Sequence, residues 1–321
     1  MSNTRRTILA AVASAVVALG AGPAAAEVVN QLSLDVWFAA NEGPSGSIGS
    51  TAFVPGPGVP PVGSGSAELT VDATGRASFG TALYKGTRLD NITQLEYWRY
   101  VSSIGGAEAP TLQFDVDYDS TDLNTVYQGR LVTYVSSPTL DTWTPVNALA
   151  GTWWATGAPG NSVCTQGSPC TWAQVLSNFP NAAIRNDPSA GGNLLFRLGG
   201  PVTGGGQVNV DDFTITASAV TTTWDFEPGV AVNPTVVQSG SLVTIRAYGF
   251  QPNSTAKSFY YINGTTGKRV LLCSATTTST GAFICTVPLP SGSLAGPAGT
   301  HGIMILGKSR IKFTTQIFTT P

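Results

Sequence analysis

The stretch Leu112-Gln113-Phe114-Asp115-Val116-Asp117-Tyr118-Asp119 alternates apolar and polar side chains without a break. Successive side chains of an extended chain point to opposite faces, so this pattern predicts a strand with one apolar and one polar face. Similar patterns lie at residues 95–101, 131–135 and 194–198. We therefore predict a sheet with one buried side, and we interpret the acidic side of the 112–119 strand as a solvated face.

The composition of the whole chain favours strands and turns over helices. Among its 321 residues are 37 glycines and 21 prolines, and only 11% are charged. Such a composition is typical of short strands joined by many turns. The net charge of −2 and the lack of a basic cluster argue against a nucleic-acid partner. We predict an all-β protein.

The first 26 residues have the three parts of an export signal. A basic pair, Arg5-Arg6, precedes an apolar run over residues 8–19, and small residues end the segment at Ala24-Ala25-Ala26. The apolar run is only about half as long as a membrane-spanning helix. We predict a signal peptide over residues 1–26, read by either the Sec or the Tat pathway, and an extracellular, secreted protein without membrane insertion.

The four cysteines form two close pairs in the sequence, Cys164 with Cys170 and Cys273 with Cys285. Disulfides persist in the oxidising compartment that the export signal implies, and local pairing is the simplest connectivity. A thiolate metal site is not expected, because neither pair has C-x-x-C spacing and His301 is the only histidine. We predict two local disulfides.

The chain after the signal peptide is long enough for two domains. Residues 207–215 have the pattern of a closing strand, and the run from Trp224 to Gly229 opens a new apolar pattern. We place the first domain at residues 27–218, a linker at 219–223 and the second domain at 224–321.

Three local signals stand out from the strand pattern. Thr171 and Gln174 form a capping box that predicts a helix over 172–179, which Pro180 ends. The proline-rich stretch 53–61 predicts a surface loop, because proline removes backbone donors and fixes φ. The turn sequence at 279–281 predicts a hairpin whose arms the Cys273–Cys285 disulfide joins.

The groups that hydrolases and nucleotide-dependent enzymes commonly use are missing from the sequence. No G-x-S-x-G elbow, phosphate loop or dinucleotide fingerprint occurs. An unactivated serine is a poor nucleophile near neutral pH, and the lone His301 lies in the second domain. We predict a non-enzyme. Two alternatives stay open: a serine–lysine dyad, and a pair of carboxylates that acts as a glycosidase.

Two acidic stretches are candidates for a cation site. On a strand, Asp115, Asp117 and Asp119 would point the same way at spacings of ~6.6 Å, which is too long for all three to ligate one ion. At Asp211-Asp212 the apolar parity changes, because Val208 and Val210 share one face whereas Phe213 and Ile215 need the opposite register. A bulge at the two aspartates reconciles these registers.

Several segments resemble known modules. Residues 65–69 and 208–215 resemble jelly-roll carbohydrate-binding modules of the galactose-binding-like kind, over 27–218, and residues 86–92 and 170–176 look like a module of uncharacterised secreted bacterial proteins. Residues 249–254, 280–288 and 299–318 look like bacterial immunoglobulin-like modules. The resemblance implies a jelly-roll β-sandwich followed by an immunoglobulin-like β-sandwich that acts as a spacer. It also implies that Asp211 or Asp212 holds a structural calcium ion.

Sugar binding requires flat aromatic faces that stack on pyranose C–H groups, together with a few orienting polar groups. Trp98 and Tyr100 share one face of a predicted strand, and Trp143 lies in a loop-like segment. We take these three as candidate ligand contacts. The favoured hypothesis is a secreted, non-catalytic binding or adhesion protein whose partner is an extracellular polysaccharide or cell-surface component. The alternatives are a structural matrix or surface component that binds no sugar, and an unrecognised hydrolase.

Overall fold

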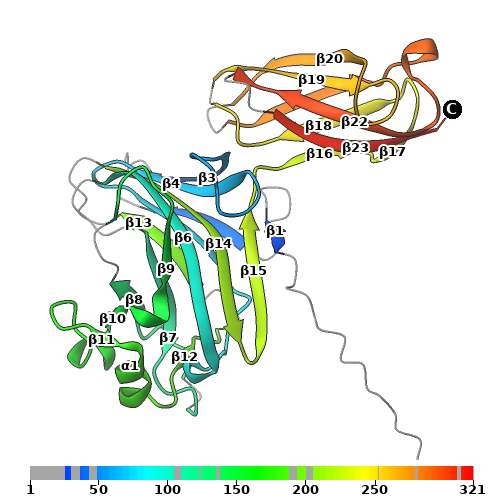
Figure 1. Ribbon diagram of the computed structural model, residues 1–321. Helices are drawn as coiled ribbons and strands as arrows, with labels where there is room; N and C mark the ends of the chain where they lie inside the picture. The colour runs from blue at the N-terminus through cyan, green and yellow to red at the C-terminus, as the bar shows by residue number, and fades with distance from the viewer. Residues whose placement is uncertain are drawn as a thin grey trace, which may run out of the picture.

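The computed structural model describes residues 26–29, 37–42, 49–104, 110–122, 124–134, 138–187, 194–199, 205–251, 253–278, 281–308 and 312–320. The signal peptide predicted over 1–26 lies outside the described residues apart from Ala26. The chain folds into two units made of strands, one above the other in the view of Figure 1. The all-β prediction is confirmed.

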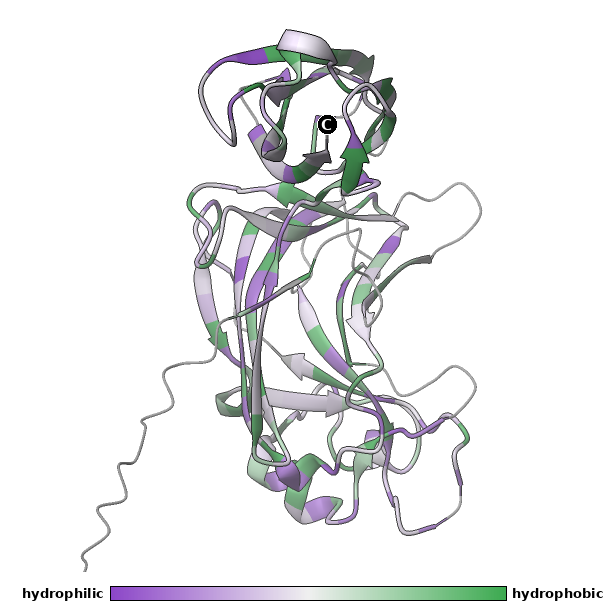
Figure 2. Ribbon diagram, turned by 90° about the vertical axis from the view of Figure 1, so that its right-hand side faces the viewer, coloured by the Kyte–Doolittle hydropathy of each residue, from purple (hydrophilic) through white to green (hydrophobic). Residues whose placement is uncertain are grey.

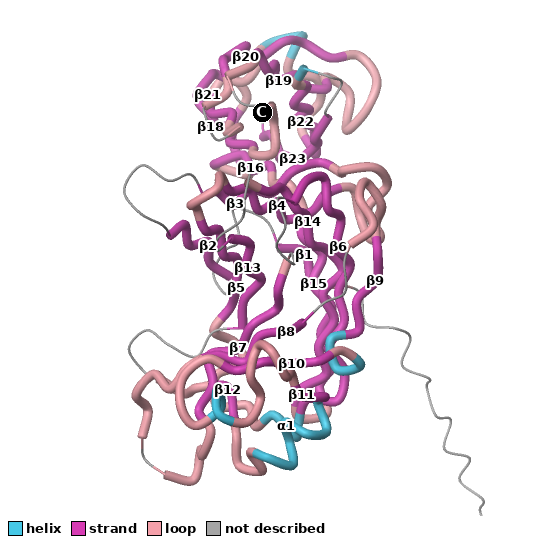
Figure 3. The backbone as a smooth tube through the Cα atoms, turned by 90° about the vertical axis from the view of Figure 1, so that its left-hand side faces the viewer, coloured by secondary structure: helices cyan, strands magenta, loops and turns pink. Residues whose placement is uncertain are grey.

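The first unit contains two facing sheets. Figure 3 shows their strands in magenta below the second unit. One sheet, called here the outer sheet, has the order β1 (Glu27–Val29), β15 (Val220–Phe226), β14 (Gly206–Ala217), β4 (Gly65–Val71), β3 (Gly49–Pro55), and its β14 also pairs with β6 (Ile92–Ile104), which pairs with β9 (Thr144–Asn147).

The second sheet of this unit has the order β11 (Cys170–Thr171), β10 (Thr152–Ala155), β8 (Arg130–Tyr134), β7 (Thr111–Asp117), β13 (Leu194–Gly199), β5 (Arg76–Thr81), β2 (Trp37–Glu42), and β12 (Ala183–Ile184) pairs with β7. Both sheets contribute to one buried apolar cluster. At its centre Trp37 stacks on Phe79 at 4.8 Å and meets the edge of Phe226 at 4.9 Å. Aromatic side chains bury large areas, so these contacts hold the sheets together.

The acidic face of β7 is not solvated as predicted. Gln113, Asp115 and Asp117 are all buried, and Asp115 accepts a hydrogen bond from Arg130 Nε at 2.9 Å. Asp117 accepts from Gln128 Nε2 at 3.2 Å. The apolar residues of β7 face the core as predicted. The polar residues on the opposite face are also covered, by other segments of the protein. These aspartates therefore have structural partners within the protein.

The helix α1 (Trp172–Asn178) has the predicted capping box at Thr171 and Gln174. It lies at the end of the first unit that is remote from the second unit (Figure 1). Four single-turn 3₁₀ segments complete the helical content of the described residues: η1 (Leu89–Asn91), η2 (Ala148–Ala150), η3 (Gly160–Ser162) and η4 (Gly292–Leu294).

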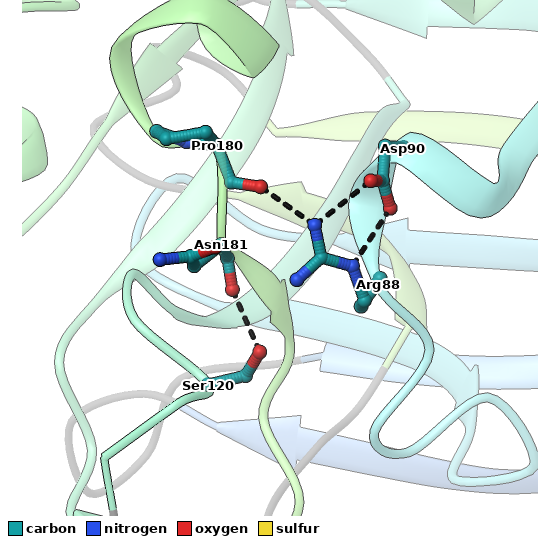
Figure 4. A network of polar contacts seen from close by, with 5 residues as sticks. All are labelled: Arg88, Asp90, Ser120, Pro180 and Asn181. Atoms are coloured by element: carbon teal, nitrogen blue, oxygen red, sulfur yellow. Dashed lines mark hydrogen bonds and ion pairs between the residues drawn. The ribbon is translucent and has the colours of Figure 1, made fainter.

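A polar network fastens the segment that follows α1 (Figure 4). The guanidinium of Arg88 donates to the carbonyl of Pro180 at 2.7 Å and pairs with Asp90 at 2.8 Å. Ser120 Oγ donates to the carbonyl of Asn181 at 2.7 Å. The segments before β6, after β7 and after α1 are thereby joined.

The second unit is also a two-layer arrangement of sheets. One sheet has the order β16 (Val230–Asn233), β18 (Leu242–Ala247), β21 (Phe283–Pro288), and the other has the order β17 (Val236–Gln238), β23 (Lys312–Thr320), β22 (Gly299–Leu306), β19 (Thr255–Tyr261), β20 (Arg269–Thr276). A separate apolar cluster fills the space between them. The chain is therefore a pair of β-sandwiches.

The seam between the units differs from the predicted linker at 219–223. Strands β14 and β15 form a hairpin through Ser218 and Ala219, and β15 belongs to the outer sheet. Trp224 and Phe226 pack in the core of the first unit. The pattern that suggested a new domain is thus the last strand of the first sandwich, and the chain enters the second one through residues 227–229.

Two further local predictions are corrected. Phe53, Val54 and Pro55 pair with β4, so the predicted surface loop begins only at Gly56. The sheet tolerates Pro55 because it ends β3 at the edge of the described strands, where a backbone N–H is dispensable. The hairpin predicted around 279–281 is also wrong, because β20 pairs with β19 whereas β21 pairs with β18. Ser279 and Thr280 themselves lie outside the described residues.

The two local disulfides are confirmed as Cys164–Cys170 and Cys273–Cys285. Because β20 and β21 belong to different sheets, Cys273–Cys285 joins the two layers of the second sandwich. It closes a short loop with a sequence separation of 12 residues.

Replacing both Cys273 and Cys285 by alanine should lower the stability of the second unit by about 3 kcal/mol, because the unfolded chain regains loop entropy. All seven tryptophans lie at or before residue 224, so tryptophan fluorescence reports the first unit alone. Amide hydrogen exchange in β18 and β21 should accelerate while the fluorescence transition stays in place. Unchanged exchange in β18 and β21 would contradict this assignment.

Candidate functional site

The aromatic candidates lie on the solvent side of the outer sheet. Leu95, Tyr97 and Val101 of β6 point into the core, so the alternate residues Trp98 and Tyr100 point outward, where both are half-buried. The strands of this unit show the alternation in Figure 2 as green and purple segments that follow one another. The shared strand face of Trp98 and Tyr100 is thus present in the structure.

Trp143 joins Tyr100 on this face. Their ring centroids are 5.6 Å apart with an interplanar angle of 61°, and Trp143 Nε1 donates to the carbonyl of Pro57 at 2.8 Å. This hydrogen bond fixes the indole against the loop that follows β3. Trp98 lies further along β6, opposite Pro145 of β9. The structure therefore brings Tyr100 and Trp143 together and leaves Trp98 as a separate aromatic face.

Trp98 borders a pocket of about 290 Å³. The polar side chains that line it are Glu96, Asn147, Asp212 and Thr214. Glu96 accepts from Asn147 Nδ2 at 3.1 Å, and its second oxygen accepts from Gln94 at 2.9 Å. Burial, and after it the nearby Glu96 carboxylate, raise the pKa of Asp212. The pocket combines one indole with carboxylate and amide groups, a combination that suits the hydroxyls and C–H groups of a sugar.

The predicted bulge at Asp211 and Asp212 is present and marks a change of partner strand. The register of β14 on β6 shifts between Asp211 and Thr214. On its other side, β14 pairs with β4 as far as Val210 and with β15 from Phe213 onward. The two aspartates therefore lie where one neighbouring strand stops and another begins.

Asp211 bridges these two strands. Its Oδ1 accepts from the backbone N–H of Phe226 at 3.0 Å and its Oδ2 from that of Val62 at 3.5 Å. The residue is fully buried. Burial disfavours the charged carboxylate and raises the pKa of Asp211 to about 8. At neutral pH Asp211 is therefore mostly protonated.

Asp225 lies beside Asp211, and Glu227 lies beside Asp225. Burial, followed by the charges of Glu227 and Asp212, raises the pKa of Asp225 to about 6. Glu227 accepts hydrogen bonds from the Ser64 hydroxyl at 2.9 Å and from the backbone N–H of Gly65 at 3.1 Å. These acceptors hold the start of β4 against the end of β15.

The calcium role expected for Asp211 or Asp212 finds no support in the described residues. They contain no group of three or more His, Cys, Asp or Glu side chains arranged to hold a metal ion. Both oxygens of Asp211 accept backbone hydrogen bonds, and Asp212 lines the pocket of Trp98. A calcium ion needs several converging oxygens. The oxygens of these two aspartates do not fit that requirement, and the calcium site stays a prediction.

Sequence reasoning missed a second cavity at the side of the first unit. It measures about 590 Å³ and is lined by residues that include Arg99, Thr133, Asn147 and Thr152. Arg99 is buried, with 2% of its surface exposed. The strand parity of β6 contained the signal, because an arginine at 99 falls on the apolar face between Tyr97 and Val101.

Comparison with known proteins identifies no family. No family model and no curated protein matches the sequence. Among solved structures, a β-1,2-glucanase from Parabacteroides distasonis is 13% identical, over 88% of this chain and 37% of the glucanase, with a TM-score of 0.30. The CBM22-1-CBM22-2 tandem domain from Paenibacillus barcinonensis Xyn10C is 12% identical, over 88% of this chain and 86% of the tandem domain, with a TM-score of 0.26.

Macromomycin is 18% identical, over 29% of this chain and 99% of macromomycin, with a TM-score of 0.24. At these TM-scores none of the likenesses identifies a ligand or a reaction. The jelly-roll and immunoglobulin-like assignments therefore stay predictions. In the described part of the chain, no helix has the length and apolar character that crossing a membrane requires. The two disulfides fit a protein of an oxidising compartment.

Replacing Asp211 by asparagine should flatten the pH dependence of stability. The folded chain keeps the Asp211 proton up to about pH 8, whereas an unfolded chain releases it near pH 4. Unfolding therefore releases a proton between these values, and stability falls as the pH rises, by at most about 1.4 kcal/mol per pH unit. The pKa of Asp225 is about 6 and that of Asp211 is about 8. Between these two pH values, the decrease in stability with rising pH is due mainly to Asp211.

Urea unfolding at a series of pH values, followed by tryptophan fluorescence, measures this slope. Asparagine keeps an oxygen that accepts from the N–H of Phe226, so the variant is expected to fold. The exposed Asp90 provides a matched control, and its asparagine variant should keep the wild-type slope. A D211N variant with the wild-type slope would show that Asp211 does not cause the pH dependence.

Proposed function

We propose that the chain is a secreted, non-catalytic binding protein that holds an extracellular polysaccharide or cell-surface glycan on the solvent side of its outer sheet. The observation that carries this proposal is the set of half-buried aromatic rings on one face, Trp98 and the Tyr100–Trp143 pair, beside Glu96 and Asp212. Aromatic residues that are only half-buried on a regular strand face offer surface to a partner, whereas core aromatics do not.

The physical basis is the amphipathic character of a sugar ring. Its C–H groups pack on the flat face of an indole or phenol, and its hydroxyls exchange hydrogen bonds with carboxylates and amides. The aromatic side chains here are positioned before any ligand binds. Trp143 donates a hydrogen bond to the carbonyl of Pro57, and Trp98 lies opposite Pro145 on the neighbouring strand. A preorganised site loses less conformational entropy on binding.

The geometry of the only histidine supports the non-catalytic part of the proposal. His301 is buried in the second unit, and both ring nitrogens lie 2.8 Å from carbonyl oxygens, those of Tyr261 and Pro297. Because His301 is buried and each ring nitrogen faces a backbone carbonyl, neither nitrogen is exposed to a substrate.

One observation favours the hydrolase alternative. Glu96 and Asp212 line the same pocket, and the pKa of Asp212 is raised. A glycosidase uses two such carboxyl groups, one of them protonated. Against this role, both oxygens of Glu96 already accept hydrogen bonds from amides, which holds them as fixed acceptors. Release of reducing sugar that is lost in both E96Q and D212N variants would establish hydrolysis and refute the non-catalytic proposal.

Replacing Trp98 by alanine should weaken glycan binding about tenfold, because a stacked aromatic contact at a binding site contributes on the order of 1–2 kcal/mol. A glycan array with the full-length protein finds the ligand class, and affinity electrophoresis in that polysaccharide measures the change. Trp154, half-buried in β10 of the second sheet, gives a matched control, and its alanine variant should bind as the wild type does. Silence of the wild type across the array would favour a structural component without sugar binding.

A further inference from the structure

A third pocket lies where the two units meet. It measures about 230 Å³, and its walls come from Pro55, Pro57, Glu68 and Asn209 of the first unit and from Phe250 and Gln251 of the second. We call it the junction pocket. In Figure 1 the second unit lies above the end of the first where β3 and β4 are found, which agrees with this composition.

One buried polar atom of the junction pocket has no partner. Asn209 is fully buried, and its Oδ1 has no hydrogen-bond donor among the described residues. Its Nδ2 donates to Ser66 Oγ at 3.0 Å, and Ser66 Oγ in turn donates to the carbonyl of Gly56 at 2.5 Å. These two hydrogen bonds fix the orientation of the Asn209 amide. If the amide were flipped, its oxygen would face Ser66 Oγ, whose only proton is already donated to the carbonyl of Gly56.

An unmatched buried acceptor is unfavourable, because it loses water and gains no donor. Native proteins seldom keep one without a ligand or a bound water. The buried Oδ1 of Asn209 therefore lacks a hydrogen-bond donor, and a molecule in the junction pocket would supply one.

Glu68, which also lines the pocket, has the same preference. Glu68 accepts from Gln207 Nε2 at 2.6 Å and from Thr70 Oγ1 at 3.5 Å, so its carboxylate is fixed in place as an acceptor. No lysine, arginine or histidine is among the described residues that line the pocket. A ligand that donates several hydrogen bonds and carries no negative charge matches these walls, while the prolines and Phe250 suit its C–H groups.

The wall from the second unit is held close to the first by a glycine. Gly249 has a φ of +92°, and a Cβ at this position would lie 2.7 Å from the carbonyl oxygen of Phe53 and 2.6 Å from Pro228 Cβ. Phe250 is held from its own side by a backbone hydrogen bond to Gly281 at 3.1 Å. The loop 249–251 thus meets β3 in a contact that only glycine permits.

The junction pocket continues from the aromatic face. Asn209 is the register partner of Tyr100 on β6 and of Glu68 on β4. Pro57, which lines the pocket, accepts the hydrogen bond of the Trp143 indole. Pro57 is therefore shared by the Tyr100–Trp143 pair and the junction pocket, so the pocket lies next to this aromatic pair.

We infer that the junction pocket binds one neutral, polyhydroxylated ring, the terminal residue of the saccharide that the outer sheet holds, with Asn209 Oδ1 accepting from a ring hydroxyl. This inference rests on the proposed function. It makes the second unit one wall of the binding site, in place of the spacer that the sequence resemblance implied. The volume of about 230 Å³ suits a single ring.

The test uses the full-length protein and a panel of methyl glycosides of neutral hexoses and pentoses, each a single ring. Binding is measured by ligand-observed NMR and by isothermal titration. Wild type should bind at least one of them. Replacing Gln251, which is exposed at the rim, by tryptophan fills the pocket from the second unit and should abolish that binding. Replacing Asn209 by leucine removes the acceptor and should weaken binding at least about tenfold.

One control variant and the polysaccharide assay separate the possible failures. Leu242→Trp places the same side chain on the exposed start of β18, at the opposite end of the strand that leads to the junction pocket, and should bind the glycoside as the wild type does. Polysaccharide binding that depends on Trp98, with no methyl glycoside bound by the wild type, would overturn the junction-pocket inference and leave the proposed function standing. Glycoside binding that survives in Q251W would overturn the inference as well. A wild type that binds neither polysaccharide nor glycoside contradicts both.

Discussion

The buried carboxyl group of Asp211 holds together a sheet that is interrupted at that point. Strands β4 and β15 follow one another along the same side of β14, and Asp211 accepts backbone hydrogen bonds at the end of one and just before the start of the other. A buried acceptor that satisfies two donors replaces the missing ladder contact. The same burial makes the charged form costly, which raises the pKa of Asp211 to about 8.

Both candidate binding regions depend on this join. The bulge that places Asp211 between the strands also turns Asp212 toward the pocket of Trp98. On the other side, Glu227 fixes the segment at Ser64 and Gly65, which begins β4 and so positions Glu68. The pocket of Trp98 and the junction pocket therefore lie on either side of one constraint, and a substitution at Asp211 is expected to disturb both.

Local features of single strands and helices could be predicted from periodicity in the sequence. The burial of strand faces and the pairing of strands depend on long-range contacts and could not. The parity change at Asp211 gave the bulge, and the capping box at Thr171 gave α1, because both signals lie within a few residues. The burial of Asp115 could not be predicted, since alternation shows that a strand has two faces but does not show what covers them. The pairing partner of β21 was equally hidden, because two strands joined by a turn can belong to different sheets.

The candidate site shows the same division between local and distant information. Trp98 and Tyr100 were found because a strand face follows from residue numbers alone, whereas Asn209 gave no signal in the sequence. An asparagine at an outward strand position is ordinarily solvated, whereas Asn209 is buried beside a pocket that a loop of the second unit also lines. Units joined by a small interface usually move relative to one another. A ligand in the junction pocket would contact both units. Its free energy of binding would then include the cost of holding the units in one arrangement. Ligand binding and the relative orientation of the units would therefore be coupled.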